Sequence, residues 1–256
     1  MNLFQTLIMA IVEGITEFLP ISSTGHLVLT AEVLKVQQTE FMKTFEITIQ
    51  FAAILSIVAI YWRKLLVDRR IFARVAAAFI PTGILGLIFY KIVKRYLLTN
   101  TTLILWSLFL GGIALIVFEL LHKEKDDSVD DLASIPYGKA VIIGIFQSIA
   151  MIPGVSRSAA TIIGGLMLGI KRKTIVEFSF LLAVPTMLAA TCLDLYKNAG
   201  DFSMDQISVL STGFVLSFIF AFLSVKWLLK FIESHTFISF GIYRIILSIV
   251  FWLFIL

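Results

Sequence analysis

Charged side chains are scarce in this chain of 256 residues. Only 15% of its residues are charged and 59% are hydrophobic, whereas soluble globular chains carry about 25% charged residues. An ordinary soluble domain is therefore excluded, and much of the apolar surface is expected to face lipid. The formal net charge of +4 comes from basic residues at the ends of apolar runs, where they fit membrane topology and contacts to anionic lipid headgroups. We accordingly expect membrane lipids, and no nucleic acid, among the partners.

Cysteine and proline are also rare. The single cysteine, Cys192, lies in an apolar run, which excludes a disulfide framework and a thiolate metal site and is typical of a small packing residue. Of the five prolines, Pro20 and Pro153 interrupt hydrophobic sequence beside clusters of polar residues. Ionisable groups at membrane depth are costly and usually persist for function, so chemistry is expected at these two places.

Long apolar runs, in contrast, are abundant. A helix needs roughly 20 apolar residues to cross a bilayer, and six segments meet this requirement. They are Thr44–Trp62, Phe72–Tyr90, Leu103–Leu121, Val176–Leu193, Ile207–Lys226 and Phe237–Leu256. The sequence therefore predicts an all-α integral membrane protein with six full spans.

Two further apolar stretches, Leu3–Val33 and Tyr137–Ile170, are broken near their middle. Proline ends a helix because it lacks a donor and clashes with the preceding turn, so each stretch is predicted to form a helix, a break and a second short helix. Non-helical backbone at membrane depth is tolerated only where it is buried in protein or lines a wet cavity. We interpret both stretches as re-entrant hairpins.

The order of these segments repeats along the chain. Residues 1–121 contain a hairpin and three spans, a charged linker occupies residues 122–136, and residues 137–256 contain a second hairpin and three spans. Because three spans is an odd number, the second repeat should be inserted upside down, with a site near the midplane where the broken helices meet. Two apolar halves can also be similar by coincidence, but that does not readily explain both breaks. We predict a single membrane domain over residues 1–256.

Basic residues predict the orientation of this domain. Thirteen lie on one predicted side and six on the other, so the first side is expected to be cytoplasmic. Both termini and the first hairpin then open to the outer side. The first group is Arg63, Lys64, Arg69, Arg70, Arg74, Lys123, Lys125, Lys139, Lys171, Arg172, Lys173, Lys226 and Lys230, and the second is Lys35, Lys43, Lys91, Lys94, Arg95 and Lys197.

Two carboxylates in the first hairpin predict a cation site. Glu13 and Glu17 are four residues apart, which puts them on one helix face. Like charges this close repel in a low dielectric unless one carboxyl is protonated or a cation lies between them. Mg²⁺ or Ca²⁺ suits such oxygens, and Mg²⁺ commonly binds one or two carboxylates plus substrate phosphates. The alternative is a solvated helix face, against which the apolar flanks argue.

Hydroxyl groups begin the second half of this hairpin. Ser22, Ser23 and Thr24 are more than one N-cap needs, and helix N-termini bind anions, so Ser22 and Thr24 are predicted to bind phosphate. His26 lies one turn beyond Ser23 and is expected to exchange a proton with its hydroxyl. A purely structural histidine is the alternative.

The second hairpin supplies a permanent cation. Arg157 offers planar, multi-donor recognition of phosphate oxygens, and a structural ion pair with Glu13 or Glu17 is the alternative role. Gln147 stands in this repeat where Glu13 stands in the first. The predicted phosphate-binding residues of this hairpin are Gly154, Ser156, Ser158 and Thr161.

These motifs carry a family resemblance. Glu13-x-x-x-Glu17 with Pro20-Ile-Ser22-Ser23-Thr24-Gly25-His26, and Pro153-Gly154-Val-Ser156-Arg157-Ser158-x-x-Thr161 downstream, resemble the bacterial undecaprenyl pyrophosphate phosphatase family, which is also known for bacitracin resistance. The resemblance spans essentially the whole chain. One departure is Ala159, where the family usually has glycine.

The resemblance implies a bacterial inner-membrane enzyme that hydrolyses the C55 isoprenyl diphosphate to the monophosphate and inorganic phosphate, recycling the lipid carrier of the cell envelope. It implies dependence on a divalent cation, Mg²⁺ or Ca²⁺, and catalytic roles for Glu17, Ser23, His26 and Arg157. Either Ser23 or a metal-activated water attacks phosphorus, and the site is expected to open to the periplasm. A transporter or flippase of an anionic lipid is the alternative function, and a homodimer remains open.

Overall fold

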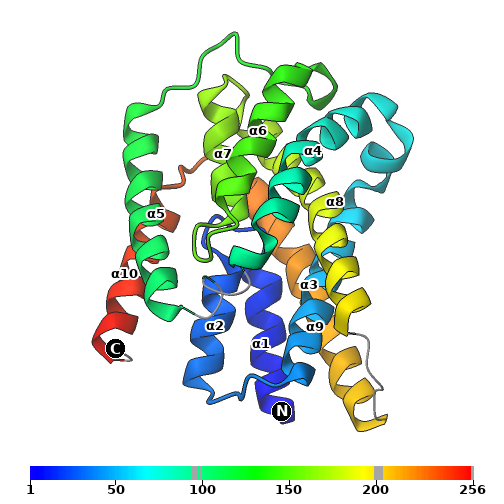
Figure 1. Ribbon diagram of the computed structural model, residues 1–256. Helices are drawn as coiled ribbons and strands as arrows, with labels where there is room; N and C mark the ends of the chain where they lie inside the picture. Colours follow the sequence, from blue (N-terminus) through cyan, green and yellow to red (C-terminus); the bar gives the residue numbers. More distant parts are fainter. Residues whose placement is uncertain (94–96, 98–99, 199–203, 255–256) are drawn as a thin grey trace.

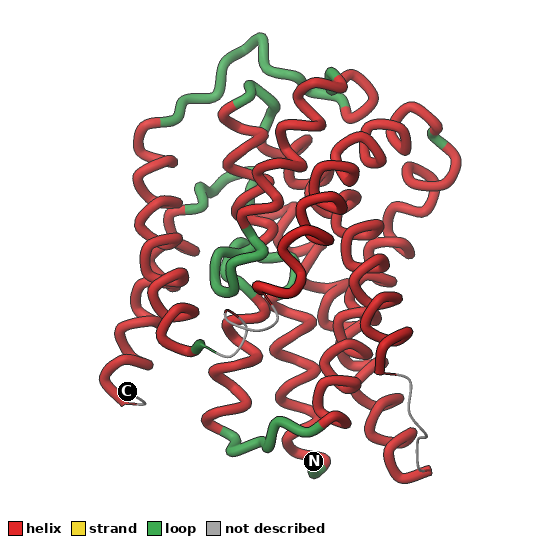
Figure 2. The backbone as a smooth tube through the Cα atoms, in the orientation of Figure 1, coloured by secondary structure: helices red, strands yellow, loops and turns green. Residues whose placement is uncertain are grey.

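The computed structural model describes residues 1–93, 97, 100–198 and 204–254, which form helices and loops without a strand (Figures 1 and 2). A π-helical turn, Arg63–Val67, and a 3-10 turn, Leu132–Ser134, accompany the α-helices. The α-helices are α1 (Leu3–Thr16), α2 (Ser23–Val33), α3 (Glu40–Trp62), α4 (Arg69–Ile92), α5 (Thr101–Leu121), α6 (Tyr137–Ile149), α7 (Arg157–Met167), α8 (Arg172–Asn198), α9 (Met204–Phe231) and α10 (Ile238–Phe254).

Within the described ranges, five helices are long and apolar enough to cross a membrane: α3, α4, α5, α8 and α9. They coincide with the first five predicted spans, so the prediction of an all-α membrane protein is confirmed. The sixth predicted span corresponds to α10, which has 17 described residues, and the last two residues of that span lie outside the described part of the chain. Membrane re-entry of the two hairpins stays a prediction.

Both broken stretches form a helix, a break and a second helix. α1 and α2 are joined through residues 17–22, and α6 and α7 through residues 150–156. The two helix pairs extend from opposite ends of the bundle, and their connecting loops meet in its interior (Figure 2). The structure therefore brings the two polar motifs together, and the ion pair between Glu17 and Arg157 joins residues that are 140 positions apart in the sequence.

Small residues allow the helices around these hairpins to approach closely. α10 packs along α5, and a Cβ atom on Gly112 would lie only 2.7 Å from the carbonyl oxygen of Gly241. α4 packs along α6, where the Thr82 hydroxyl donates to the carbonyl of Gly144 at 2.8 Å. Such contacts hold membrane helices together because lipid offers no hydrophobic drive for their association.

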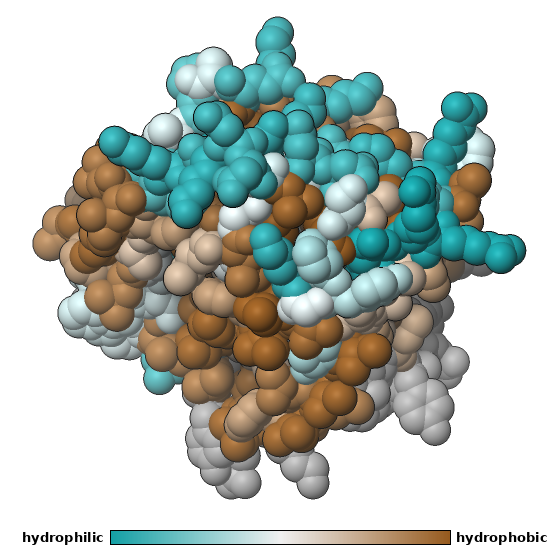
Figure 3. Space-filling view, turned by 90° about the horizontal axis from the view of Figure 1, so that it is seen from above, coloured by the Kyte–Doolittle hydropathy of each residue, from teal (hydrophilic) through white to brown (hydrophobic). Residues whose placement is uncertain are grey.

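Polar side chains gather at one end of the bundle (Figure 3). This end carries the α3–α4 turn, the linker between the repeats and the α7–α8 turn (Figure 1), which together hold most of the thirteen basic residues predicted to be cytoplasmic. Of the six predicted on the other side, Lys94 and Arg95 lie outside the described residues, as do the side chains of Lys91 and Lys197. The grouping of the described basic residues agrees with the predicted separation of the two sides.

Candidate active site

Each hairpin turns at a serine with a positive φ angle, and we call these two residues, Ser22 and Ser156, the corners of the hairpins. Ser22 has φ 72° and Ser156 has φ 79°, a region that residues other than glycine rarely adopt. Each serine is the N-cap of the helix that follows: the Ser22 hydroxyl accepts from the N–H of Gly25 at 3.4 Å, and the Ser156 hydroxyl accepts from the N–H of Ala159 at 3.2 Å. Both corners therefore direct a helix N-terminus, with its positive dipole end, into the bundle interior.

Glu17 joins the residues that follow these corners. Ser23 is the first residue of α2, and its hydroxyl donates to Oε2 of Glu17. Arg157 is the first residue of α7, and its Nη2 donates to Oε1 of Glu17 at 2.9 Å. The Glu17 side chain is only 6% exposed. One buried carboxylate thus accepts hydrogen bonds from a hydroxyl group of its own hairpin and from a guanidinium of the other hairpin.

Packing against α8 fixes the direction of Arg157. Its Nη1 donates to the carbonyl of Ser179 at 3.2 Å, and the guanidinium carbon lies 5.7 Å from the ring centre of Phe18. Thr161 also faces α8, where its hydroxyl lies 2.6 Å from that of Ser179. The structure therefore places Thr161, predicted to bind phosphate, in the contact between α7 and α8.

Other predicted phosphate ligands lie at the two corners. Thr24 is half-buried, whereas Ser22, Ser156 and Ser158 are buried, and the hydroxyl of Ser158 has no hydrogen-bond partner among the described residues. Gly154 has φ 92°, and a Cβ atom there would lie 2.6 Å from the carbonyl oxygen of Ile104. Glycine at this position is therefore required by the turn and by α5, and not only by a ligand.

His26 contacts residues other than Ser23. Its Nδ1 lies 2.8 Å from the carbonyl oxygen of Ser22, and its Nε2 lies 2.8 Å from the hydroxyl of Tyr243 in α10. Because a carbonyl only accepts, Nδ1 carries the proton in the neutral ring and Nε2 accepts from Tyr243. In the structure the Ser23 hydroxyl is hydrogen-bonded to Glu17 and not to His26. Proton exchange between His26 and Ser23 stays a prediction.

Tyr243 is a site residue that the sequence interpretation missed. Its ring is stacked on that of His26, with centroids 5.5 Å apart and planes 9° from parallel. The contact joins residues 217 positions apart, and an aromatic residue in an apolar helix carries no signal that distinguishes it from packing.

Glu13 is completely buried, and neither carboxylate oxygen has a hydrogen-bond partner among the described residues. A buried charge without a partner is costly, so this group requires a proton or a cation. Its free oxygens on the helix face of Glu17 fit a hard divalent ion. No cluster of three or more acidic, histidine or cysteine side chains occurs among the described residues, so such an ion would take its other ligands from substrate or water.

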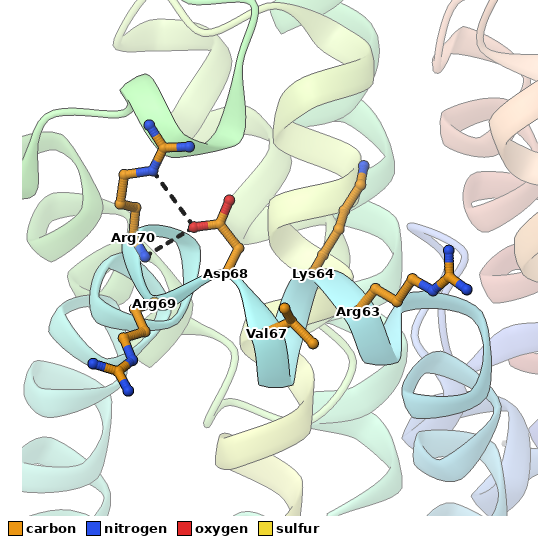
Figure 4. A pocket seen from close by; sticks show the side chains of 6 residues that line it. All are labelled: Arg63, Lys64, Val67, Asp68, Arg69 and Arg70. Carbon is orange, nitrogen blue, oxygen red and sulfur yellow. Dashed lines mark hydrogen bonds and ion pairs between the residues drawn. The ribbon is translucent and has the colours of Figure 1, made fainter.

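A second polar feature lies at the α3–α4 turn (Figure 4). A depression of about 510 Å³ is lined by Arg63, Lys64, Val67, Asp68, Arg69 and Arg70. Desolvation raises the pKa of Asp68, but hydrogen bonds from the N–H groups of Arg70 and Ile71 outweigh it and hold this pKa below its ordinary value. The depression contains none of the predicted catalytic residues and belongs to the basic end of the bundle.

The fold and the site together define a class of protein. Apolar helices surround a carboxylate, hydroxyl groups and a guanidinium at the meeting point of two helix N-termini, which is the arrangement of a multi-pass membrane protein that handles an anionic group.

Comparison with known proteins identifies the family. A family described as "Bacitracin resistance protein BacA" matches residues 6–250, and this chain belongs to it. It is 53% identical over 253 residues to a protein of Sulfurihydrogenibium sp. (strain YO3AOP1), with 99% of both chains covered. It is 50% identical over 256 residues to one of Aquifex aeolicus (strain VF5), with 100% of both covered, and 41% identical over 254 residues to one of Methanococcus aeolicus, with 99% of both covered. All three relatives bear the name undecaprenyl-diphosphatase.

Proposed function

We propose that this protein is a membrane phosphatase that hydrolyses undecaprenyl diphosphate, the C55 isoprenyl diphosphate, to undecaprenyl phosphate and inorganic phosphate. Family membership and the name shared by its full-length relatives support this function. They favour it over the transporter or flippase that inverted repeats also allow. The reaction returns the cell-envelope lipid carrier to its monophosphate form.

The observation that carries the proposal is the sharing of Glu17 between Ser23 and Arg157. The Ser23 hydroxyl, hydrogen-bonded to the Glu17 carboxylate, is a nucleophile beside its base. The Arg157 guanidinium, paired with the same carboxylate, lies next to the reacting atoms, where it neutralises phosphoryl charge. Pure anion transport gains little from a carboxylate placed at the substrate, whereas phosphoryl transfer uses all three groups.

The diphosphate binds between the two corners while the isoprenyl tail stays among the apolar helices. The first N–H groups of a helix have no intrahelical partner, so the N-termini of α2 and α7 both offer donors to phosphate oxygens. Thr24 and Ser158 lie in these first turns, beside the N-caps Ser22 and Ser156. Arg157 adds a charge that remains at any physiological pH.

Ser23 attacks the terminal phosphorus in line with the bridging oxygen. Its proton passes to Glu17, a bond forms from Oγ to phosphorus, and the bond to the bridging oxygen breaks, which releases the isoprenyl monophosphate. Glu17 gives this proton to the departing monophosphate and becomes a carboxylate again. Water then attacks the phosphoserine, its proton passes to Glu17 and from there to the leaving Oγ, and inorganic phosphate and the Ser23 hydroxyl are freed. His26, held by Ser22 and Tyr243, keeps the first turn of α2 in place and lies one turn from the reacting hydroxyl. Stabilisation of the transferring phosphoryl group is mainly positioning and electrostatics.

A divalent cation, Mg²⁺ or Ca²⁺, would be held by Glu13 together with Glu17. The unpartnered oxygens of Glu13 support this assignment. The ion would supply positive charge that neutralises diphosphate oxygens.

We also propose the membrane arrangement that accompanies this function. The chain forms six spans and two re-entrant hairpins as an inverted repeat, supported by the matching corners at Ser22 and Ser156 and by the approach of the hairpins from opposite ends (Figure 1). It lies in the inner membrane, and the first hairpin opens to the periplasmic side. A homodimer is compatible with this arrangement.

The proposal is tested by phosphate release from undecaprenyl diphosphate by the purified protein in detergent, where transport is impossible. The wild type should release phosphate, a chelator should lower the rate, and Ser23→Ala and Arg157→Ala should each lower kcat by at least about 100-fold. Ser211→Ala is the matched control, because its exposed hydroxyl bonds only to its own helix. A wild-type protein that releases no phosphate would refute the function, and near-normal turnover of Ser23→Ala would refute the covalent route.

A further inference from the structure

Arg244 is a fully buried arginine of α10, and its hydrogen-bond partners among the described residues are all backbone carbonyls. It stands beside Tyr243, which contacts His26, yet the mechanism above does not use it. Its nitrogens donate to Leu108 (3.3 Å from Nε), Pro20 (3.3 Å from Nη1), Val155 (3.0 Å from Nη1), Ser107 (3.0 Å from Nη2) and Gly154 (2.8 Å from Nη2).

These bonds join three segments that are distant in the sequence. Pro20 belongs to the tip of the first hairpin, Gly154 and Val155 to the tip of the second, and the remaining two acceptors to α5. The carbonyl oxygens of Pro20 and Val155 bind the same nitrogen atom, Nη1. A planar guanidinium with five donors can serve so many acceptors at once, whereas an ammonium cannot. Arg244 therefore fastens both hairpin tips to each other and to α5.

The positions of these carbonyls matter for the site. Val155 directly precedes the corner at Ser156, and Pro20 lies two residues before the corner at Ser22. In a trans peptide the C=O and the following N–H point in opposite directions, so holding the Val155 carbonyl turns the N–H of Ser156 away from α10. The corners then decide where α2 and α7 begin, and hence where Ser23 and Arg157 lie.

We propose that Arg244 is a positioning residue of the phosphatase reaction, one that sets the two hairpin tips so that Ser23 and Arg157 meet on Glu17. This inference rests on the proposed function. A buried guanidinium without a carboxylate partner among the described residues is costly in a membrane, and tip positioning accounts for its presence.

Gly111 offers an independent way to disturb the same contact. A Cβ atom on Gly111 would lie 2.8 Å from the guanidinium carbon of Arg244 and 3.3 Å from its Nη1. Gly111→Ala therefore displaces the guanidinium without changing Arg244 itself. Gly83→Ala is the matched control, because a Cβ atom there would meet only ring carbons of Phe79 at 3.5 Å or more.

The experiment measures kcat and KM for phosphate release from undecaprenyl diphosphate per folded molecule, with folded protein counted by size exclusion. Arg244→Lys and Gly111→Ala should lower kcat by at least about 100-fold, because a misplacement near 1 Å costs about that much. KM should stay within about threefold, since the isoprenyl tail still binds. Gly83→Ala and Arg69→Lys, at the exposed basic end, should match the wild type in both constants.

Amide hydrogen exchange gives a second readout that needs no activity. Peptides covering residues 17–26 and 150–160 should exchange faster in Arg244→Lys and Gly111→Ala than in the wild type and the two controls. A kcat of Arg244→Lys within about threefold of the wild type, or unchanged exchange at both tips, would overturn the inference. A wild type that is inactive but shows the expected exchange pattern would count against the phosphatase function alone.

Discussion

Glu17 is the residue whose two oxygens serve different hairpins. One oxygen accepts from Ser23 in its own hairpin and the other from Arg157 in the second. Its carboxylate therefore accepts a hydrogen bond from a hydroxyl and pairs with an arginine at the same time. In the proposed reaction it also takes the nucleophile's proton. A neutral residue of the same shape can neither form the ion pair nor take up the proton.

Replacing Glu17 by glutamine separates shape from charge. The amide fills the same volume, but it cannot take up a proton and presents an N–H₂ group to one of two donors. We expect Glu17→Gln to lower kcat by roughly 10²- to 10⁴-fold, the range for loss of a general base. Phosphate release by the purified variant measures this, with Glu32→Gln, an exposed carboxamide change in the same hairpin, as control. Retention of more than a tenth of wild-type kcat would show that Glu17 is not the base.

At the scale of the helices, a second buried ion pair fastens the ends of three elements. Glu119 near the end of α5 accepts from Nη1 and Nη2 of Arg172 at the start of α8, the latter at 3.0 Å. It also accepts from the N–H of Phe237, just before α10, at 3.1 Å. The carboxylate side chain is 2% exposed, so it is a structural group that the surrounding helices enclose.

Breaking this pair should destabilise the bundle. Glu119→Ala leaves Arg172 half-buried without its counterion, and we expect a loss of about 3 kcal/mol in the free energy of unfolding. Unfolding of the detergent-solubilised protein followed by circular dichroism measures this. The double variant Glu119→Leu with Arg172→Met should recover most of the loss, because both buried charges are then absent. Equal free energies of unfolding for Glu119→Ala and the wild type would show that this ion pair does not stabilise the bundle.

At the scale of the whole molecule, the separation of charges predicts one orientation. The linker and the α3–α4 turn lie at one end of the bundle and the α2–α3 loop at the other (Figure 1). The basic end should remain in the cytoplasm. Since the first hairpin extends from the opposite end, its side of the site then faces outward, where the product phosphate would be released.

Labelling with a membrane-impermeant maleimide tests this orientation. In a Cys192→Ser background, Gln37→Cys in the α2–α3 loop should react in intact spheroplasts, whereas Asp127→Cys in the linker should react only after the membrane is permeabilised. Both positions are exposed, so access to the reagent and not burial decides the outcome. The reverse labelling pattern would show that the protein has the opposite orientation in the membrane, without changing the geometry of the site.

Three of the hairpin boundaries could be read from the sequence because their signals are local, whereas the predicted spans α3, α8 and α9 are longer in the structure than predicted. Proline and hydroxyl-rich turns within apolar sequence predicted both breaks, and the structure begins α1 at Leu3, ends α2 at Val33 and begins α6 at Tyr137, as expected. The meeting of Arg157 with a carboxylate of the first hairpin was also accessible, with Glu13 and Glu17 as the two candidates, but the sequence did not decide between them.

Other features of the site carry no pattern that a sequence can display. Arg244 binds five backbone carbonyls, and carbonyls are present at every residue. Helical spacing favoured His26 as the partner of Ser23, but Ser23 is the first residue of α2, and side chains lean toward the helix N-terminus. Its hydroxyl therefore reaches back into the break, where Glu17 lies.

The left-handed serines at the two corners have a consequence for how this protein balances durability against reactivity. A non-glycine residue in that conformation carries about 1–3 kcal/mol of backbone strain, and here two are held by neighbours such as Arg244. Part of the energy that folds the bundle is consequently diverted into aiming a hydroxyl and a guanidinium at one spot. Substitutions selected only for thermal stability would remove the strain at these two serines, and the resulting protein is expected to be more stable and less active.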